Sequence, residues 1–353
     1  MENTVLKKYF LGANSANGFY SMFSENYAPD WTAYIIKGGA GTGKSSLMRR
    51  FAEKATSKGL TAELCPCSSD PDSLDAVILP EQKTIILDGT APHIVEPKYP
   101  GVCEQIINTG DYWDKAKLKE NSAEILNIMK ENKAYHKKAS AYITACGQLK
   151  KFNFSHSLNI TDINACFDFG AGLAKRHIRK TGNSPREWVR FLGGITPKGY
   201  IFFNQTINCF ASKIVIKDEY GAAASIMLSA IKDYALYKKH EIITVKNPIL
   251  PHDITDAVII PSLSLIFVRE EFEKIDCENK KHNAHRFYNT EQLKKAKEKI
   301  KFNKKAYFTL LDAAAQTLSR AKSTHDQLEN FYIDAMDYTA LNEFFNSFLD
   351  KSL

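Results

Sequence analysis

The chain has 353 residues and a formal net charge of +7, with 44% of its residues hydrophobic and 25% charged. These values are typical of a globular protein, and the length suggests two domains of moderate size. No apolar run approaches the roughly 18 residues that a membrane span requires, which argues against a membrane protein. Residues 1–4 lack the basic and apolar regions of a signal peptide, so we expect a cytoplasmic location.

The cysteines and the positive charge exclude few functions. The seven cysteines are scattered and odd in number, which is typical of reduced thiols. Cys65-Pro66-Cys67 could form a metal or redox pair, but no further ligands follow at suitable spacing, so two small buried residues on a strand are favoured. The net charge and the basic stretch 175–180 permit contact with nucleic acid without requiring it.

The most informative segment comes early in the chain. An apolar, β-branched run at residues 33–36 predicts a buried strand, and residues 46–58 have a helical pattern. Between them lies the pattern G-x-x-x-x-G-K-[ST] of a phosphate-binding loop, or P-loop. The residues expected to bind a nucleotide are Gly38, Gly39, Ala40, Gly41, Thr42, Gly43, Lys44, Ser45 and Ser46. The alternative is a glycine-rich turn before an ordinary helix.

The P-loop pattern implies a specific chemistry. Its glycines let backbone N–H groups converge on phosphate oxygens at a helix N-terminus. Lys44 would reach the β- and γ-phosphates, and the Ser45 hydroxyl would bind Mg²⁺. ATP is favoured over GTP because the chain has no guanine-specificity motif of the Asn-Lys-x-Asp type.

The strands that follow supply further candidates for the site. Residues 60–67 predict one strand, and residues 84–88 predict another that ends in Asp88, as in a Walker B motif. Asp88 would hold Mg²⁺ through water, although a strand-ending turn residue is the alternative. Between these strands lie Asp70, Asp72 and Asp75. One of them could complete the Mg²⁺ shell, but capping of a helix by Asp72 or Ser73 is the favoured explanation.

The loop that follows Asp88 is rich in reactive side chains. Gly89 stands where many ATPases place a glutamate that orients the attacking water. His93 or Glu96 is therefore our candidate for the general base, and Lys98 for a phosphate contact. Otherwise this loop is a rigid turn whose polar groups face solvent.

Each half of the chain then ends in residues with a helical pattern. Residues 116–149 are rich in helix formers, and from Leu293 to Ala321 apolar residues recur at helical spacing. We expect a helical pair appended to each half. Packing between the helices is favoured over a surface that binds a partner protein.

The two halves also repeat short stretches at a nearly constant offset, which indicates a tandem duplication. The matching stretches are Phe10-Leu11-Gly12 with Phe191-Leu192-Gly193, Gly18-Phe19 with Gly199-Tyr200, Asp75-Ala76-Val77-Ile78 with Asp256-Ala257-Val258-Ile259, and Ile36-Lys37 with Ile216-Lys217. Ala224 replaces Lys44, and Arg269 replaces Asp88. The acidic Asp218 and Glu219 would repel phosphate, so we expect no nucleotide site in the second half.

Together, the P-loop, the loop from Asp88 to Gly101 and the degenerate second copy resemble an uncharacterised bacterial family of tandem P-loop ATPases or nucleotide-kinase-like proteins. The resemblance covers the whole chain, and the loop after Asp88 is its most specific part. It implies ATP binding and a tandem P-loop fold, and it specifies no substrate.

The sequence thus predicts an α/β protein with two parallel sheets of P-loop NTPase type, each with helices on both faces. Residues 1–187 would form the active domain and residues 188–353 the degenerate one. The favoured function is a Mg²⁺-dependent ATPase whose second half regulates it or binds a protein partner. The alternatives are a kinase that phosphorylates a small molecule or nucleotide, a non-enzymatic ATP-dependent switch or scaffold, and a motor acting on nucleic acid.

Overall fold

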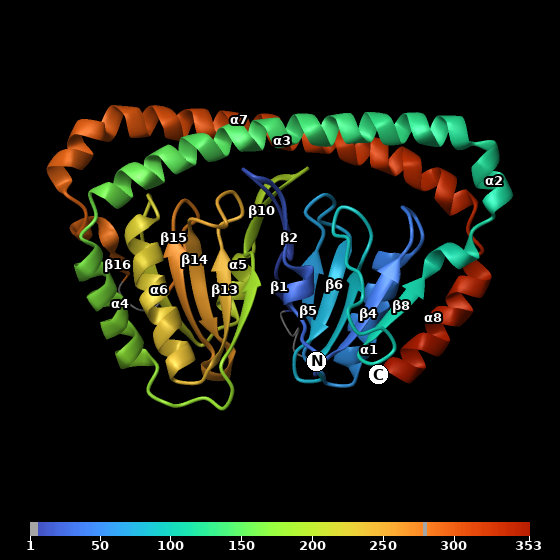
Figure 1. Cartoon of the computed structure of the whole chain (residues 1–353), viewed down its shortest axis with the longest axis horizontal. Coiled ribbons are helices and arrows are strands. Elements are labelled where there is room, and N and C mark those ends of the chain that lie inside the picture. Colours follow the sequence, from blue (N-terminus) through green and yellow to red (C-terminus); the bar gives the residue numbers. More distant parts are fainter. Residues whose placement is uncertain (1–5, 278–280) are drawn as a thin grey trace.

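The computed structural model describes residues 6–277 and 281–353, which form two six-stranded sheets and long helices (Figure 1). In sheet order, the strands of the first half are β1 (Lys7–Lys8), β5 (Glu63–Pro66), β6 (Leu74–Leu79), β7 (Thr84–Asp88), β4 (Thr32–Lys37) and β8 (Glu104–Asn108). Those of the second half are β9 (Arg186–Arg190), β13 (Glu241–Lys246), β14 (Thr255–Ile260), β15 (Leu265–Glu270), β12 (Ser212–Lys217) and β16 (His282–Asn283).

Both sheets have the same strand order and the same pattern of strand directions, as a duplication predicts. The pairs β5–β6 and β6–β7 are antiparallel, whereas β7–β4, β4–β8 and β1–β5 are parallel, and the second sheet repeats this pattern. The prediction of parallel sheets was therefore wrong, and the sheets are mixed. The reason is that β6 and β14 were not recognised as strands. Each is joined to the next strand by a connection too short to cross over to a parallel neighbour.

The two sheets pack against each other face to face. In β4, Ala33 and Ile35 point into a core that also contains Trp188 and Val268 of the second half, whereas Tyr34 and Ile36 point toward helices. The prediction of helices on both faces of each sheet was thus wrong, because each sheet buries its inner face on the other sheet. A run of consecutive apolar residues shows that a strand has two buried faces, but it does not show what covers each face.

Four of the helices cover the outer faces of the sheets. They are α1 (Lys44–Ser57) and α8 (Tyr338–Ser352) on the first sheet, and α4 (Ile163–His177) and α6 (Ala222–Tyr237) on the second. The chain reaches these positions through α2 (Lys115–Glu120), α3 (Ser122–Asn159) and α7 (Thr290–Asp334). Smaller elements are the hairpins β2 (Gly12–Ser15) with β3 (Gly18–Ser21) and β10 (Gly193–Thr196) with β11 (Gly199–Phe202), the short helix α5 (Asn204–Asn208), and 3₁₀ turns at Phe23–Glu25, Thr109–Tyr112, Pro261–Leu263 and Ala284–Phe287.

The long helices α3 and α7 lie side by side across the top of both sheets and run in opposite directions (Figure 1). Asn132 of α3 donates from Nδ2 to the carbonyl of Ala321 at 2.7 Å, and Asn303 of α7 donates to Asn153 at 2.9 Å. The expected helical pair in each half is therefore wrong. The long helix of each half pairs with that of the other, and this pair spans both halves.

This pair of helices also exchanges the terminal helices between the halves. The helix α3 leads to α4, which packs on α6 of the second half, and α7 leads to α8, which packs on α1 of the first half. Backbone hydrogen bonds join the connecting segments at both ends of this pair. The N–H of Asp114 donates to Ala335 at 2.7 Å, and that of Asp162 donates to Phe287 at 2.8 Å. The proposed domain boundary at 187/188 stays a prediction and falls within β9.

In the described part of the chain, no helix is both long enough and apolar enough to cross a membrane.

Candidate functional site

The predicted phosphate-binding loop connects β4 to α1, with a strand before it and a helix after it, as expected from the sequence. Gly43 precedes α1 with a φ of 77°, a left-handed conformation that favours glycine. A Cβ atom on Gly38 would lie 1.9 Å from the Oγ1 of Thr109, so a larger residue does not fit there. Thr109 donates to the backbone carbonyl of Lys37 at 3.1 Å and to Thr42 Oγ1 at 3.0 Å. The loop is thus held from the edge of the sheet.

Lys44 and Asp88 meet at this loop. Because β4 and β7 are parallel neighbours, Ile36 lies opposite Asp88, and the carboxylate comes to the start of α1. The Lys44 Nζ atom lies 3.6 Å from Asp88 Oδ2 and donates to the carbonyls of Gly38 and Gly39 at 3.0 and 2.5 Å. Asp88 also accepts hydrogen bonds from the backbone and the hydroxyl of Thr90. A cation and a carboxylate at a helix N-terminus are the groups that a Mg²⁺–phosphate site requires.

Ser45 and Ser46 differ in their surroundings. The Oγ atom of Ser45 accepts the N–H of Leu74 at 2.9 Å, so it faces the start of β6, whereas Ser46 is exposed. The expected cap of a helix by Asp72 or Ser73 was wrong, because a strand begins at Leu74. The signal that misled us was a polar turn, which precedes strands as readily as helices.

His93 lies near the loop but is not a free base. It is 5% exposed, its Nε2 atom is 3.3 Å from Asp75 Oδ2, and its ring lies against Phe23 at 4.6 Å between centroids. Burial lowers the pKa of His93, but the carboxylate of Asp75 outweighs this effect and leaves the pKa above its usual value. The imidazole is therefore held against Asp75, and this contact would have to break before the ring could take a proton from water.

Glu96 is placed differently from His93. Its side chain is 68% exposed and lies 2.5 Å from the Nζ atom of Lys37, which also donates to the carbonyls of Gly89 and Val95 at 2.9 and 2.8 Å. Lys37 thus holds the start of the loop after Asp88. The sequence analysis named Lys37 only as part of the repeated Ile-Lys pair at the ends of β4 and β12 and missed this role.

The second half of the chain covers the predicted phosphate-binding loop. The hydroxyl of Tyr338 in α8 donates to the carbonyl of Gly41 at 2.7 Å, and a Cβ atom on Gly41 would lie 2.9 Å from the carbonyl of Glu329 in α7. Ala40 and Tyr332 of the same helix pack against one apolar cluster. No local sequence signal points to these contacts, because nearly 300 residues separate Gly41 from Tyr338.

In the corresponding loop of the second half, the side chain of Asp218 folds back onto the loop and the start of α6. Asp218 is 3% exposed, and its carboxylate accepts the N–H groups of Tyr220 at 3.0 Å and Ala224 at 2.9 Å and the hydroxyl of Tyr288 at 2.9 Å. Arg269 donates to the backbone carbonyl of Asp218 at 3.1 Å. A carboxylate therefore lies at the N-terminus of α6, where a phosphate would bind in a working site.

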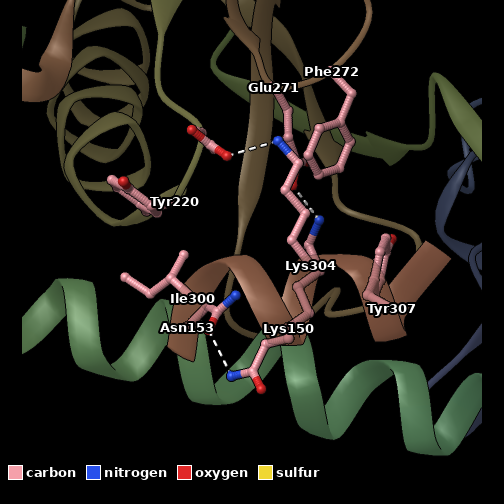
Figure 2. Close-up of a pocket in the computed structure, with 10 residues that line it drawn as sticks. Lys150, Asn153, Tyr220, Glu271, Phe272, Ile300, Lys304 and Tyr307 are labelled. Atoms are coloured by element: carbon pink, nitrogen blue, oxygen red, sulfur yellow. Dashed lines mark hydrogen bonds and ion pairs between the residues drawn. The ribbon is translucent and has the colours of Figure 1, made fainter. Parts of the chain in front are cut away.

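A cavity of the second half lies between this loop, α3 and α7 (Figure 2). Its charged side chains are already paired, since Lys150 lies 2.6 Å from Glu271 and Lys304 lies 2.7 Å from Glu219. An adjoining cavity of about 150 Å³ is lined by Tyr200, Arg269 and Phe308 among others. Neither cavity presents an unpaired lysine or arginine among these residues for a phosphate to bind.

Comparison of the chain with family models, curated proteins and solved structures finds no match. The resemblance to a tandem P-loop family therefore stays a prediction, and a proposal of function depends on the geometry of the site.

Proposed function

We propose that the protein is a Mg²⁺-dependent ATPase with one working nucleotide site, formed by residues 38–46 and Asp88 of the first half. The observation that carries this proposal is the meeting of Lys44 and Asp88, 3.6 Å apart, at the N-terminus of α1. The same position of the second half has neither residue and is filled by Asp218. One half thus has the charges that bind a nucleotide, and the other has replaced them.

The residues present fit the roles that this reaction requires. The Lys44 ammonium would neutralise charge on the transferred phosphoryl group, and the N–H groups at the start of α1 would bind phosphate oxygens. Ser45 and Asp88 supply the oxygen ligands that Mg²⁺ prefers, and the bound ion would neutralise further phosphate charge. These polar groups lie at the carboxyl ends of β4 and β7, where α/β sheets bind their ligands.

The geometry around Asp88 also determines the rate of ATP hydrolysis that we expect. Gly89 provides no side chain to orient water, His93 is paired with Asp75, and Glu96 is paired with Lys37. We therefore expect slow hydrolysis until the loop after Asp88 moves. Because α7 and α8 contact Gly41, a nucleotide-dependent shift of this loop would be passed to the second half.

The same feature favours a kinase as the second candidate. A kinase must not activate water, and no carboxylate follows Asp88 directly. In this case the γ-phosphoryl group would pass to a small molecule or nucleotide, and phosphate release without an acceptor would be negligible.

The test is phosphate release from Mg-ATP by the wild type, by Lys44→Ala and by Lys305→Ala. Lys305 is an exposed lysine of α7 and serves as the matched control. We expect turnover in the wild type and the control, and loss of turnover in Lys44→Ala with an unchanged melting temperature. Equal turnover in all three would refute the proposed site. ATP binding without turnover in the wild type would refute the ATPase and direct the search to phosphoryl acceptors.

A further inference from the structure

Three side chains of different chemistry meet beside the nucleotide site. Cys67 follows β5, Asp75 lies in β6, and His93 lies in the loop after β7, and one ligand atom of each falls within 4.8 Å of the others. Asp75 and His93 are each 5% exposed. They meet because β5, β6 and β7 are adjacent antiparallel strands, so the end of β5, the start of β6 and the end of β7 lie at one edge of the sheet.

The three donors form a characteristic set. A thiolate, an imidazole nitrogen and a carboxylate oxygen are the ligands of zinc in proteins, whereas Mg²⁺ prefers oxygen alone. Three protein ligands leave a fourth position open in a tetrahedral site. The Nδ1 atom of His93 is buried and has no hydrogen-bond partner among the described residues, so the polar groups of this cluster are not fully satisfied by the protein itself.

The second half shows how the fold neutralises the same position without a metal. Strand register aligns Asp75 with Asp256, Cys67 with Asn247 and Asp88 with Arg269. Asp256 accepts from the Arg269 guanidinium at 2.6 Å and from the Asn247 amide at 2.9 Å. A permanent cation therefore balances the buried carboxylate in that half.

The first half lacks this built-in cation. A second carboxylate, Asp88, stands in the place of the guanidinium, and the amide is replaced by the Cys67 thiol. Lys44 lies beside Asp88, so it does not take the position that Arg269 has next to Asp256. Buried carboxylates are costly unless a cation pairs with them. The first half thus lacks the fixed cation, and it has a thiol, which is a possible zinc ligand, in place of the amide.

We propose that Cys67, Asp75 and His93 bind a Zn²⁺ ion. Binding would displace the proton of the Cys67 thiol and any proton on His93, so that a thiolate, a carboxylate and a neutral imidazole hold the ion. The ion would join the turn at residues 68–73 to the loop after Asp88, next to Ser45 and Lys44. This site is separate from the proposed nucleotide site, and its occupancy does not depend on ATP.

The test uses the nucleotide-free full chain with Co²⁺ as a spectroscopic probe for the zinc site. We expect one Co²⁺ per chain, with a thiolate-to-cobalt charge-transfer band that Zn²⁺ abolishes and Mg²⁺ does not. Cys67→Ser should remove the band, and His93→Gln should weaken Zn²⁺ binding by more than about 100-fold, beyond the effect typical of outer-shell changes. Cys103→Ser, at a half-buried free thiol, and Lys44→Ala are the controls that should keep the band.

Three results would overturn the proposal. They are the absence of a charge-transfer band in the wild type, a band that survives in Cys67→Ser, and Zn²⁺ affinity unchanged in a folded His93→Gln variant. The melting temperature of each variant separates loss of a ligand from loss of the fold. Because Lys44→Ala removes nucleotide chemistry while it keeps the three ligands, the metal site and the ATPase can fail independently.

Discussion

The Asp218 carboxylate at the N-terminus of α6 leads to a prediction that can be tested in depth. Its carboxylate is buried and accepts hydrogen bonds from Tyr220, Ala224 and Tyr288. Substitution Asp218→Ala removes the acceptor of all three and the negative charge at the N-terminus of α6. The buried N–H of Ala224 and hydroxyl of Tyr288, and the half-buried N–H of Tyr220, then lose this acceptor.

The cost follows from these contacts. Hydrogen bonds to a charged group contribute about 1.5–3 kcal/mol each, and a charge near a helix N-terminus contributes up to about 2 kcal/mol in a partly buried position. These terms are not additive, because the same carboxylate makes them all. We therefore expect Asp218→Ala to lower the free energy of unfolding by about 3–5 kcal/mol, the range for breaking a buried charged contact.

The assay is urea unfolding of the wild type, Asp218→Ala and Asp218→Asn, with and without sulfate. Asp218→Asn keeps the shape of the side chain and removes its charge, so it isolates the electrostatic part. In Asp218→Ala the vacated N–H groups of α6 should bind sulfate, which would restore about 2.7 kcal/mol at 100 times its dissociation constant. Sulfate also stabilises proteins by exclusion from their surface, so only the excess over the wild type counts.

Two results would refute this reasoning. One is an Asp218→Ala variant as stable as the wild type, which would show that the carboxylate does not replace a bound anion. The other is a destabilised variant that gains no more from sulfate than the wild type, which would show that the N-terminus of α6 is not an anion site.

The remaining predictions concern packing, pH and the covered loop. Phe345→Ala should lower the free energy of unfolding in urea by about 3–5 kcal/mol, because this 2% exposed side chain of α8 packs in the core under α1, and an unchanged value would contradict the exchange of helices. Burial raises the pKa of Glu271, but the Arg269 guanidinium and Lys150 outweigh this effect and leave the pKa lowered. The ionised Glu271 carboxylate therefore stabilises the fold above the ordinary glutamate pKa of about 4.3, and this stabilisation is lost as the pH falls through the pKa of the folded state. The stability difference between the wild type and Glu271→Gln should therefore be larger at pH 7 than at pH 3 in urea titrations, and a constant difference would argue against the charge. Tyr338→Phe removes the hydrogen bond to Gly41, which contributes about 0.5–1.5 kcal/mol, so mass spectrometry should detect up to about tenfold faster amide hydrogen exchange in the loop, and equal exchange would show that α8 does not restrain it.

Local signals predicted the elements around the candidate site well. The strand, glycine-rich loop and helix from β4 to α1 follow the expected boundaries closely, and β7 ends at Asp88 as the apolar run indicated. These features depend on neighbours in the sequence, such as β-branched runs, a left-handed glycine and helical periodicity. The repeated stretches also predicted correctly that the two halves are related, and both sheets have the same strand order.

Other features escaped prediction because they depend on residues far apart in the chain. The alternating residues of β4 show two apolar faces, but only the packing shows that one face meets the other sheet and the other meets α1 and α8. The roles of Lys37 and Tyr338 at the loop, and the meeting of Cys67 with His93, likewise required the folded chain.

The sequence by itself thus determined the P-loop pattern, its loss in the second half and the presence of two related α/β units. Only the tertiary structure decided that the sheets are mixed and pack on each other, that α4 and α8 are exchanged between the halves, and that the Asp218 carboxylate binds the N-terminus of α6. The physical reason is that backbone propensity and periodicity act over a few residues, whereas burial depends on which distant surface comes to cover each apolar face.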